Sequence, residues 1–204
     1  MSVKDFVQQR RDALIAMRRD FHMYPEPAWL EYRSAAKVAD RLISLGYDVA
    51  LGADVLDLDS RMGLPSDEVM KAAMDRAIEE GANLELVEKM GYGKTAIVAT
   101  MNFGGEGSVV AFRVDMDSND VIEAKEDNHV PTKKGFRSCH DKAMHACGHD
   151  AHMTMGLGLA EYLATHKDEF KGTIKLIFQP AEEGVRGALS LIHISEPTRP
   201  RLIS

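Results

Sequence analysis

Thr173-Ile-Lys-Leu-Ile-Phe-Gln-Pro-Ala-Glu-Glu183 is an apolar run that ends at two neighbouring carboxylates. The run predicts a buried strand over 173–179, and Pro180 ends it because proline has no N–H to donate to a sheet. Helical patterns alternate with apolar strands elsewhere in the chain, which predicts an α/β sandwich with helices on both faces of one sheet. Residues that follow strand ends converge at one edge of such a sheet. Glu182 and Glu183 therefore mark the edge where a site is expected.

The flanking sequence supplies the other elements of this sandwich. Apolar residues recur at helical spacing and predict helices over 4–21, 31–45, 66–88 and 152–164. Short apolar runs predict strands over 47–51, 95–101 and 108–114. The glycine-rich stretch 102–107 is typical of a hairpin or a tight connection. The polar stretch 118–144 is expected to form a long surface loop that borders the site.

Potential metal ligands are densest in Met144-His-Ala-Cys-Gly-His-Asp-Ala-His-Met-Thr-Met155. Imidazole, thiolate and carboxylate groups all bind divalent metals once deprotonated. The stretch contains His145, Cys147, His149, Asp150 and His152. Gly148 permits a tight turn that aims the side chains on either side of it at one point.

Asp115 and Asp117 follow the strand over 108–114 and share one face of it, because alternate residues of a strand point the same way. A capping or turn role fits these two residues as well as a site role does. Cys147 alone would fit a buried thiol, and the pair Glu182 and Glu183 alone would fit a solvated helix start. The strand-end argument nevertheless predicts that these motifs meet.

Composition narrows the class of protein. The 204 residues, 45% of them hydrophobic, suffice for one core or for one domain and part of another. An excess of 32 acidic over 25 basic residues argues against a nucleic-acid partner. No apolar run is long enough to cross a bilayer, and the N-terminus lacks the apolar core of a secretory signal, so a cytoplasmic location is expected. Cys139 is expected to be structural, and no function is expected of His22, His129, His140 and His166.

Three motifs in this order resemble the M20 metallopeptidase family: Phe112-Arg-Val-Asp-Met-Asp117, His145-Ala-Cys-Gly-His-Asp150 and Phe178-Gln-Pro-Ala-Glu-Glu183. The resemblance is to the amidohydrolase branch that cleaves N-acyl amino acids, and within it to the aminobenzoyl-glutamate hydrolases. It covers about residues 5–188. The resemblance implies a three-layer α/β/α sandwich of the zinc-peptidase type. It also implies hydrolysis of the amide bond of p-aminobenzoyl-glutamate or a related N-acyl amino acid.

The same resemblance implies roles for individual residues. Cys147, His149 and Glu183 match metal ligands for two divalent ions, Mn²⁺ or Zn²⁺, and Glu182 matches the general base that acts on a metal-activated water. Weaker matches, as residues that orient or bridge ligands, are Asp115, Asp117, Asp150 and His152. Two other interpretations stay open: a structural module that the metal merely stabilises, and a non-catalytic fragment.

The end of the chain departs from the family pattern. Residues 189–204 contain two prolines and resemble a translated adapter tail, so we expect 1–188 to be the N-terminal part of an M20 catalytic domain and 189–204 a non-native tail. The resemblance implies further metal-binding histidines and a dimerisation domain that this truncated chain lacks, so the chain alone is expected to be inactive. For the full-length protein it implies a small-molecule substrate, a homodimer or a heteromer of A and B subunits, and no nucleic-acid or membrane partner.

Overall fold

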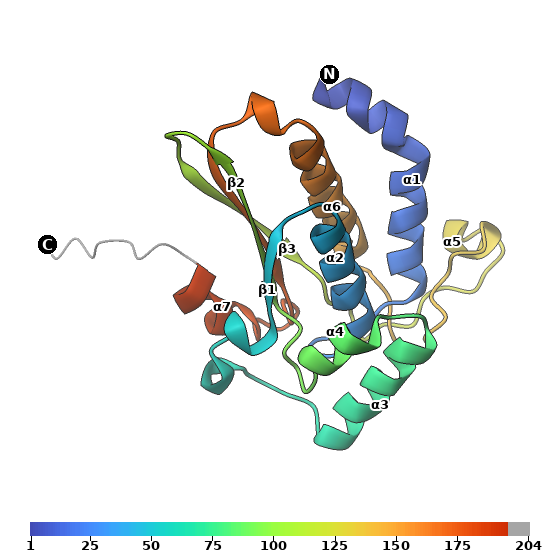
Figure 1. Ribbon diagram of the computed structural model, residues 1–204. Coiled ribbons are helices and arrows are strands. Elements are labelled where there is room, and N and C mark those ends of the chain that lie inside the picture. Colours follow the sequence, from blue (N-terminus) through green and yellow to red (C-terminus); the bar gives the residue numbers. More distant parts are fainter. Residues whose placement is uncertain (196–204) are drawn as a thin grey trace, which may run out of the picture.

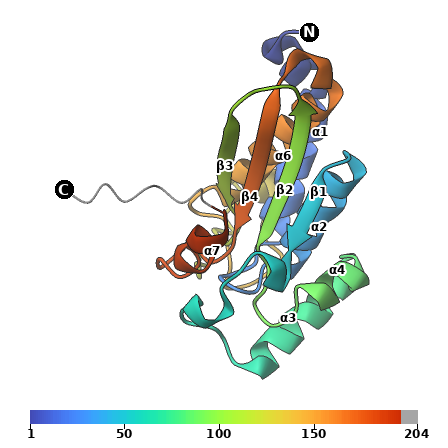
Figure 2. The ribbon, with the colours of Figure 1, turned by 60° about the vertical axis from the view of Figure 1, so that its left-hand side comes forward.

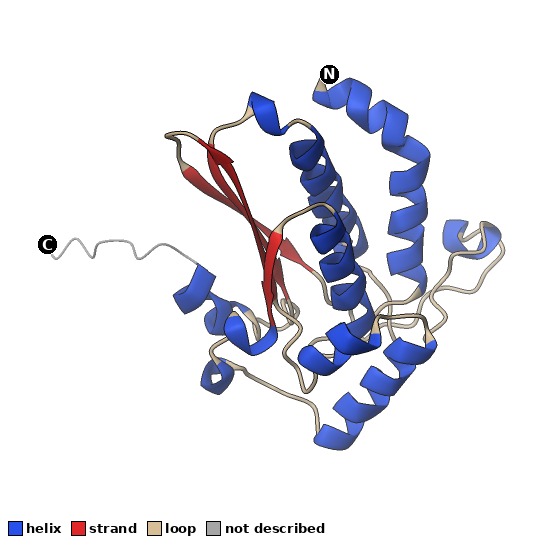
Figure 3. Cartoon of the chain, in the orientation of Figure 1, coloured by secondary structure: helices blue, strands red, loops and turns tan. Residues whose placement is uncertain are grey.

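The computed structural model describes residues 1–195 as one sheet flanked by helices (Figures 1 and 3). The helices are α1 (Val3–Met23), α2 (Tyr32–Ser44), α3 (Asp67–Glu79), α4 (Leu84–Lys89), α5 (Val130–Lys133), α6 (His149–Thr165) and α7 (Ala188–Ser195). The strands are β1 (Asp48–Leu51), β2 (Ile97–Gly104), β3 (Val109–Asp115) and β4 (Gly172–Gln179). Among the described residues, no helix combines the length and apolar character needed to cross a membrane.

The four strands form one mixed sheet in the order β1-β2-β4-β3. β2 pairs antiparallel with β1 and with β4, whereas β3 runs parallel to β4. Stretch 102–107 is therefore the tight connection and not the hairpin, since β4 lies between the two strands that it joins. The apolar sequence of β4 explains its central place: Leu176, Ile177 and Phe178 are all buried, although neighbouring side chains point to opposite faces.

Helices cover both faces of this sheet, as the sequence predicted. Helices α1, α2 and α6 form the layer on one face, where Ile97 of β2 and Leu176 of β4 join the larger hydrophobic core. The next residues along these strands, Val98 and Ile177, point to the other face and pack with Leu191 of α7. Figure 2 shows α7 on the opposite side of the sheet from α2 and α6.

Two predicted helices have different boundaries in the structure. The segment predicted as one helix over 66–88 is two helices, α3 and α4, because Gly81 adopts a left-handed φ of 86° between them. Helix α6 begins at His149 instead of 152, directly after Gly148 with φ 83°. Gly156 lets α6 approach the sheet closely, because a Cβ there would lie 2.9 Å from Val114 Cγ2. The first turn of α6 is thereby fixed near the ends of β3 and β4.

Helix α7 crosses the boundary predicted between residues 188 and 189. Leu191 is 3% exposed and packs against Val55 and Leu56. Residues 196–204 lie outside the described residues. The division into 1–188 and a non-native tail over 189–204 stays a prediction.

Candidate metal centre

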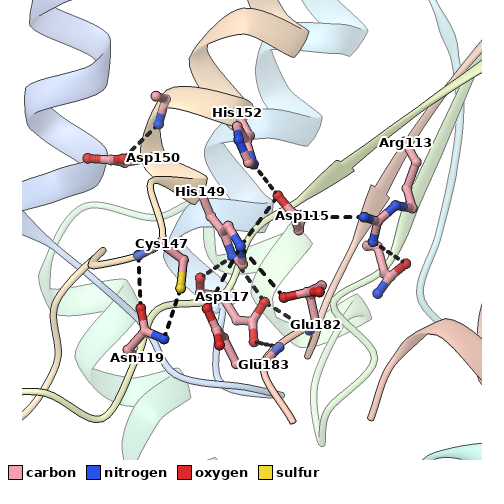
Figure 4. Close-up of polar contacts among 12 residues, drawn as sticks. Arg113, Asp115, Asp117, Asn119, Cys147, His149, Asp150, His152, Glu182 and Glu183 are labelled. Carbon is pink, nitrogen blue, oxygen red and sulfur yellow. Dashed lines mark hydrogen bonds and ion pairs between the residues drawn. The ribbon is translucent and has the colours of Figure 1, made fainter. Parts of the chain in front are cut away.

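The carboxyl ends of β3 and β4 meet at one edge of the sheet, as the strand-end argument predicted. Asp115 pairs in register with Gln179, so Asp117 and the two glutamates leave the sheet side by side. The first turn of α6 adds His149 and His152 from above (Figure 4). We call this group the strand-end cluster; its members are Asp115, Asp117, Cys147, His149, His152, Glu182 and Glu183.

His149 lies at the centre of the strand-end cluster and is 4% exposed. Its Nδ1 donates to the backbone oxygen of Asp117 at 2.7 Å, which leaves Nε2 as the free nitrogen. Three carboxylate oxygens face that nitrogen: Asp115 Oδ1 at 3.7 Å, Glu182 Oε2 at 3.7 Å and Glu183 Oε1 at 3.9 Å. These distances are too long for hydrogen bonds. They are close to the separation of about 3.4 Å between two ligands on one tetrahedral ion.

The carboxylates change how His149 holds protons. Burial disfavours the charged ring, but the hydrogen bond to Asp117 and the negative charge of Asp115 outweigh it and raise the pKa of His149 to about 9. Burial likewise opposes ionisation of Asp115, yet its hydrogen bond with His152 and the nearby His149 lower the pKa of that carboxyl. Without a metal, a proton on His149 therefore balances part of the negative charge. A metal cation can take that proton's place.

Asp117 holds the two glutamates in place through their backbone. It is 1% exposed; its Oδ1 accepts the N–H of Glu182 and its Oδ2 accepts the N–H of Glu183, both at 2.9 Å. Both carboxylate oxygens are engaged in this way. Asp117 thus orients the turn, and its backbone oxygen also orients His149.

A second buried carboxylate, Glu31, holds the same turn from below. Its Oε1 accepts the N–H of Ala181 at 2.8 Å, and its Oε2 accepts the hydroxyl of Thr95 at 2.7 Å. Ala181 adopts a left-handed φ of 51°, which an alanine rarely does without such support. Burial and then the charge of Asp117 raise the pKa of Glu31 to about 8.

The two glutamates differ in exposure. The Glu182 side chain is 39% exposed and that of Glu183 is 27% exposed. Glu183 Oε1 is buried and has no hydrogen-bond partner among the described residues. A buried oxygen left unpaired costs about 1–3 kcal/mol, which a bound cation would offset. Glu183 therefore has the character of a ligand, and the more open Glu182 can reach a reacting molecule.

Cys147 approaches Glu183 from the loop before α6. Its N–H donates to Asn119 Oδ1 at 3.1 Å, and its Sγ accepts from Asn119 Nδ2 at 3.4 Å. Contact with the Glu183 carboxylate is the main cause that raises the pKa of the Cys147 thiol. A thiolate, an imidazole nitrogen and carboxylate oxygens are a donor set that suits Zn²⁺, and the nitrogen and oxygen donors also suit Mn²⁺. The residues present thus fit a metal centre.

The four weaker candidates divide into two groups. His152 Nδ1 lies 2.5 Å from Asp115 Oδ1, and both lie with His149 in one set of potential ligand atoms, while His149, Glu182 and Glu183 make up another. Asp150 points the other way, toward α1 (Figure 4). Its Oδ2 accepts from His22 at 2.7 Å and from Arg18 at 2.9 Å. The structure therefore brings Asp115, Asp117 and His152 to the ligands but places Asp150 elsewhere.

Sequence reasoning missed several residues that shape the centre. Arg113 Nη1 donates to Gln179 at 3.0 Å and Nη2 lies 3.4 Å from Asp115. Its position two residues before Asp115, on the same face of β3, is a signal that could have found it. Asn119 carries the same spacing from Asp117. No local pattern points to Glu31, which contacts Ala181 across 150 positions of sequence.

Comparison with known proteins places this geometry in a family. The model of peptidase family M20/M25/M40 matches residues 111–202. Indole-3-acetyl-aspartic acid hydrolase of Enterobacter agglomerans is 46% identical over 190 residues, 93% of this chain and 44% of that protein. The A-type polypeptide of the Escherichia coli K12 p-aminobenzoyl-glutamate hydrolase is 46% identical over 191 residues, 94% of this chain and 44% of that protein. The chain thus spans less than half the length of these relatives.

Solved structures agree. An aminobenzoyl-glutamate utilization protein from Klebsiella pneumoniae matches with a TM-score of 0.79 and 40% identity, covering 95% of this chain and 43% of that one. A Bacillus subtilis protein described as a dinuclear metal-binding peptidase of family M20 matches with a TM-score of 0.60 and 27% identity, covering 91% of this chain and 38% of that one. The three motifs, the sandwich fold and these relatives lead to one conclusion: the chain belongs to the M20/M25/M40 peptidase family.

Proposed function

We propose that the whole protein hydrolyses the amide bond of p-aminobenzoyl-glutamate or a related N-acyl amino acid. The observation that carries this proposal is the buried His149 Nε2, which faces three carboxylate oxygens beside an unpaired Glu183 oxygen. Two relatives are named for p-aminobenzoyl-glutamate and indole-3-acetyl-aspartic acid. Both names describe an aromatic acyl group joined to an acidic amino acid. We therefore propose substrates of that class.

Cys147, His149 and Glu183 are the proposed ligands for two divalent ions, Zn²⁺ or Mn²⁺. Bound there, such ions lower the pKa of a water molecule and polarise an amide carbonyl. Glu182 takes a proton from the attacking water as the C–O bond forms, and it returns that proton to the amine as the C–N bond breaks. Its greater exposure suits this role, because a base must reach the substrate. Asp117 and Glu31 hold the backbone on which Glu182 stands.

The relative from Escherichia coli is named as one of the subunits of its enzyme, the one designated A. We accordingly propose that the whole protein works as a homodimer or as a heteromer of A and B subunits.

The general-base role is tested by Glu182→Ala in a polypeptide that spans the full length of the relatives. We expect hydrolysis of p-aminobenzoyl-glutamate and indole-3-acetyl-aspartate to fall by about 10²- to 10⁴-fold while the bound metal is retained. Glu183→Ala should lose metal as well as activity. The matched control is Glu106→Ala, at an exposed residue outside the cluster, which should leave both unchanged.

Two outcomes would contradict the proposal. Retained hydrolysis in Glu182→Ala would remove the general base. A metal held by four protein ligands in an intact protein without turnover would favour the structural module instead. Residues 1–204 assayed alone are expected to be inactive, and turnover at the rate of the longer polypeptide would contradict that expectation.

A further inference from the structure

We propose that Glu80, Cys139 and His140 form a second metal site, separate from the strand-end cluster, that takes a zinc-like divalent ion. One potential ligand atom from each residue lies within 4.8 Å of the other two. Glu80 directly follows α3, and the other two lie in the long loop before α6. We call these three residues the outer cluster; none of them belongs to the strand-end cluster.

His140 has the anchoring typical of a metal-binding histidine. Its Nδ1 lies 2.7 Å from the backbone oxygen of Pro25, and its Nε2 lies 2.7 Å from Glu80 Oε1. A backbone carbonyl that holds one ring nitrogen fixes the tautomer and aims the other nitrogen. Because both partners accept hydrogen bonds, the metal-free ring donates from both nitrogens. An ion between Nε2 and Oε1 would replace one of these protons and would widen the contact by less than about 1 Å.

Glu80 has one carboxylate oxygen free for an ion. Oε1 contacts His140, but Oε2 is buried and has no hydrogen-bond partner among the described residues. The backbone of Glu80 is fixed, since its carbonyl accepts from Arg33 Nε at 3.1 Å. An ion bound here would give Oε2 the partner that it lacks.

Cys139 supplies the third donor. Its N–H donates to the backbone oxygen of Met23 at 2.9 Å, so its position is fixed, and its side chain is exposed to arriving ions. Burial and then the charge of Glu80 raise the pKa of the thiol. A bound cation favours the thiolate, and together with the Glu80 carboxylate it then balances a divalent charge. The nearby Arg33 is already neutralised by Asp20 at 2.8 Å.

The ligand types select the ion. Thiolate, imidazole and carboxylate with an open fourth position for water suit Zn²⁺ and disfavour Ca²⁺ and Mg²⁺, which prefer oxygen ligands. The ion would tie α3 to the loop that also carries Asn119 and Cys147. The outer cluster would thereby stiffen one wall of the strand-end site without joining its chemistry.

Cobalt tests this site, because Co²⁺ bound to a thiolate absorbs in the near ultraviolet and takes zinc-like geometry. The chain has two cysteines, so Cys147→Ser leaves Cys139 as the only thiol. We expect Cys147→Ser to keep one equivalent of the cobalt–thiolate band. His140→Ala in that background should weaken cobalt binding at least tenfold, since a ligand is lost. The matched control, His166→Ala in the same background, should leave the band unchanged.

A thermal measurement separates loss of the site from loss of folding. Zn²⁺ should raise the Tm of Cys147→Ser, and the rise should shrink when Cys139→Ser is added, because an ion stabilises a fold only in proportion to its affinity for it. Circular dichroism confirms that each variant is folded. Absence of the band in folded Cys147→Ser, or a zinc-induced rise that is the same with and without Cys139→Ser, overturns the proposal.

Discussion

His149 and Asp150 are neighbours in the first turn of α6, yet they belong to two opposite electrostatic environments. His149 faces the strand-end cluster, in which four carboxylates gather: Asp115, Asp117, Glu182 and Glu183. Asp150 faces a network under α1, in which each carboxylate has cationic or imidazole partners. We call this the α1 network; its members are Arg18, His22, Glu123, His129 and Asp150.

The α1 network is balanced without any metal. Burial opposes ionisation of Asp150, but its hydrogen bond with His22 and the charges of His145 and Arg18 lower its pKa. The pKa of Glu123 is also lowered, because hydrogen bonds with His129 and His22 outweigh burial. The strand-end cluster instead keeps an unpaired oxygen on Glu183. The comparison teaches that one side of the helix start serves stability and the other is prepared for cations.

The largest expected effect is loss of stability in the α1 network. Asp150→Ala leaves Arg18 and His22 without their buried partner, and breaking such a pair costs about 3–5 kcal/mol. Urea unfolding would show this as a lower midpoint with an unchanged slope. Asp12→Ala is the matched control, since that carboxylate is 96% exposed and its loss should change the free energy of unfolding by less than about 0.5 kcal/mol. A loss below about 1 kcal/mol in Asp150→Ala would deny the network its structural role.

A smaller effect is expected in the strand-end cluster. Asp117→Asn replaces one acceptor oxygen by an NH₂ group that cannot accept the N–H of Glu182 or Glu183. The turn should shift, and metal affinity should fall by about 10- to 100-fold, as for other groups that orient ligands. Calorimetric titration with Zn²⁺ and Mn²⁺ measures this fall. Affinity equal to that of the unchanged protein would show that Asp117 does not position the ligands.

The sequence predicted the strand-end cluster better than the α1 network, for a physical reason. Carboxyl ends of neighbouring parallel strands must meet, so Asp115 and Glu183 could be placed together from strand positions alone. No such rule joins His22 to Asp150, which are 128 positions apart. His22 and His129 were therefore expected to have no function, yet both contact the buried Glu123.

The sheet order shows the same limit. Short spacing and glycines left the connection over 102–107 open between a hairpin and a tight turn, because both need the same residues. The choice depends on where β4 inserts, and β4 lies 57 positions after Asp115 at its first residue, Gly172. Burial of β4 on both faces decided it. Helices α1 and α2, whose patterns are local, were predicted to within a few residues.

The smallest expected effect is a pH dependence that distinguishes the two environments. Burial alone would lower the pKa of His22, but hydrogen bonds to Asp150 and Glu123 outweigh burial and raise it above the ordinary 6.5. The folded state thus holds this proton after the unfolded state has released it. The stabilisation is complete below about pH 6.5 and is lost as pH rises through the folded pKa. For Asp150 and Glu123 the sign is opposite, and their contribution is lost as pH falls below their ordinary values of 3.8 and 4.5.

The α1 network should therefore stabilise the fold most between about pH 4.5 and 6.5. His22→Gln keeps a polar side chain but cannot titrate, so it isolates the contribution of the ring. We expect the unfolding free energy of the unchanged protein to approach that of His22→Gln as pH rises above 6.5, by about 1.4 kcal/mol for each unit between the folded and unfolded pKa values. Urea midpoints of both proteins across this range measure the approach. A constant difference would mean that His22 is neutral in the folded protein and that Arg18 alone balances Asp150.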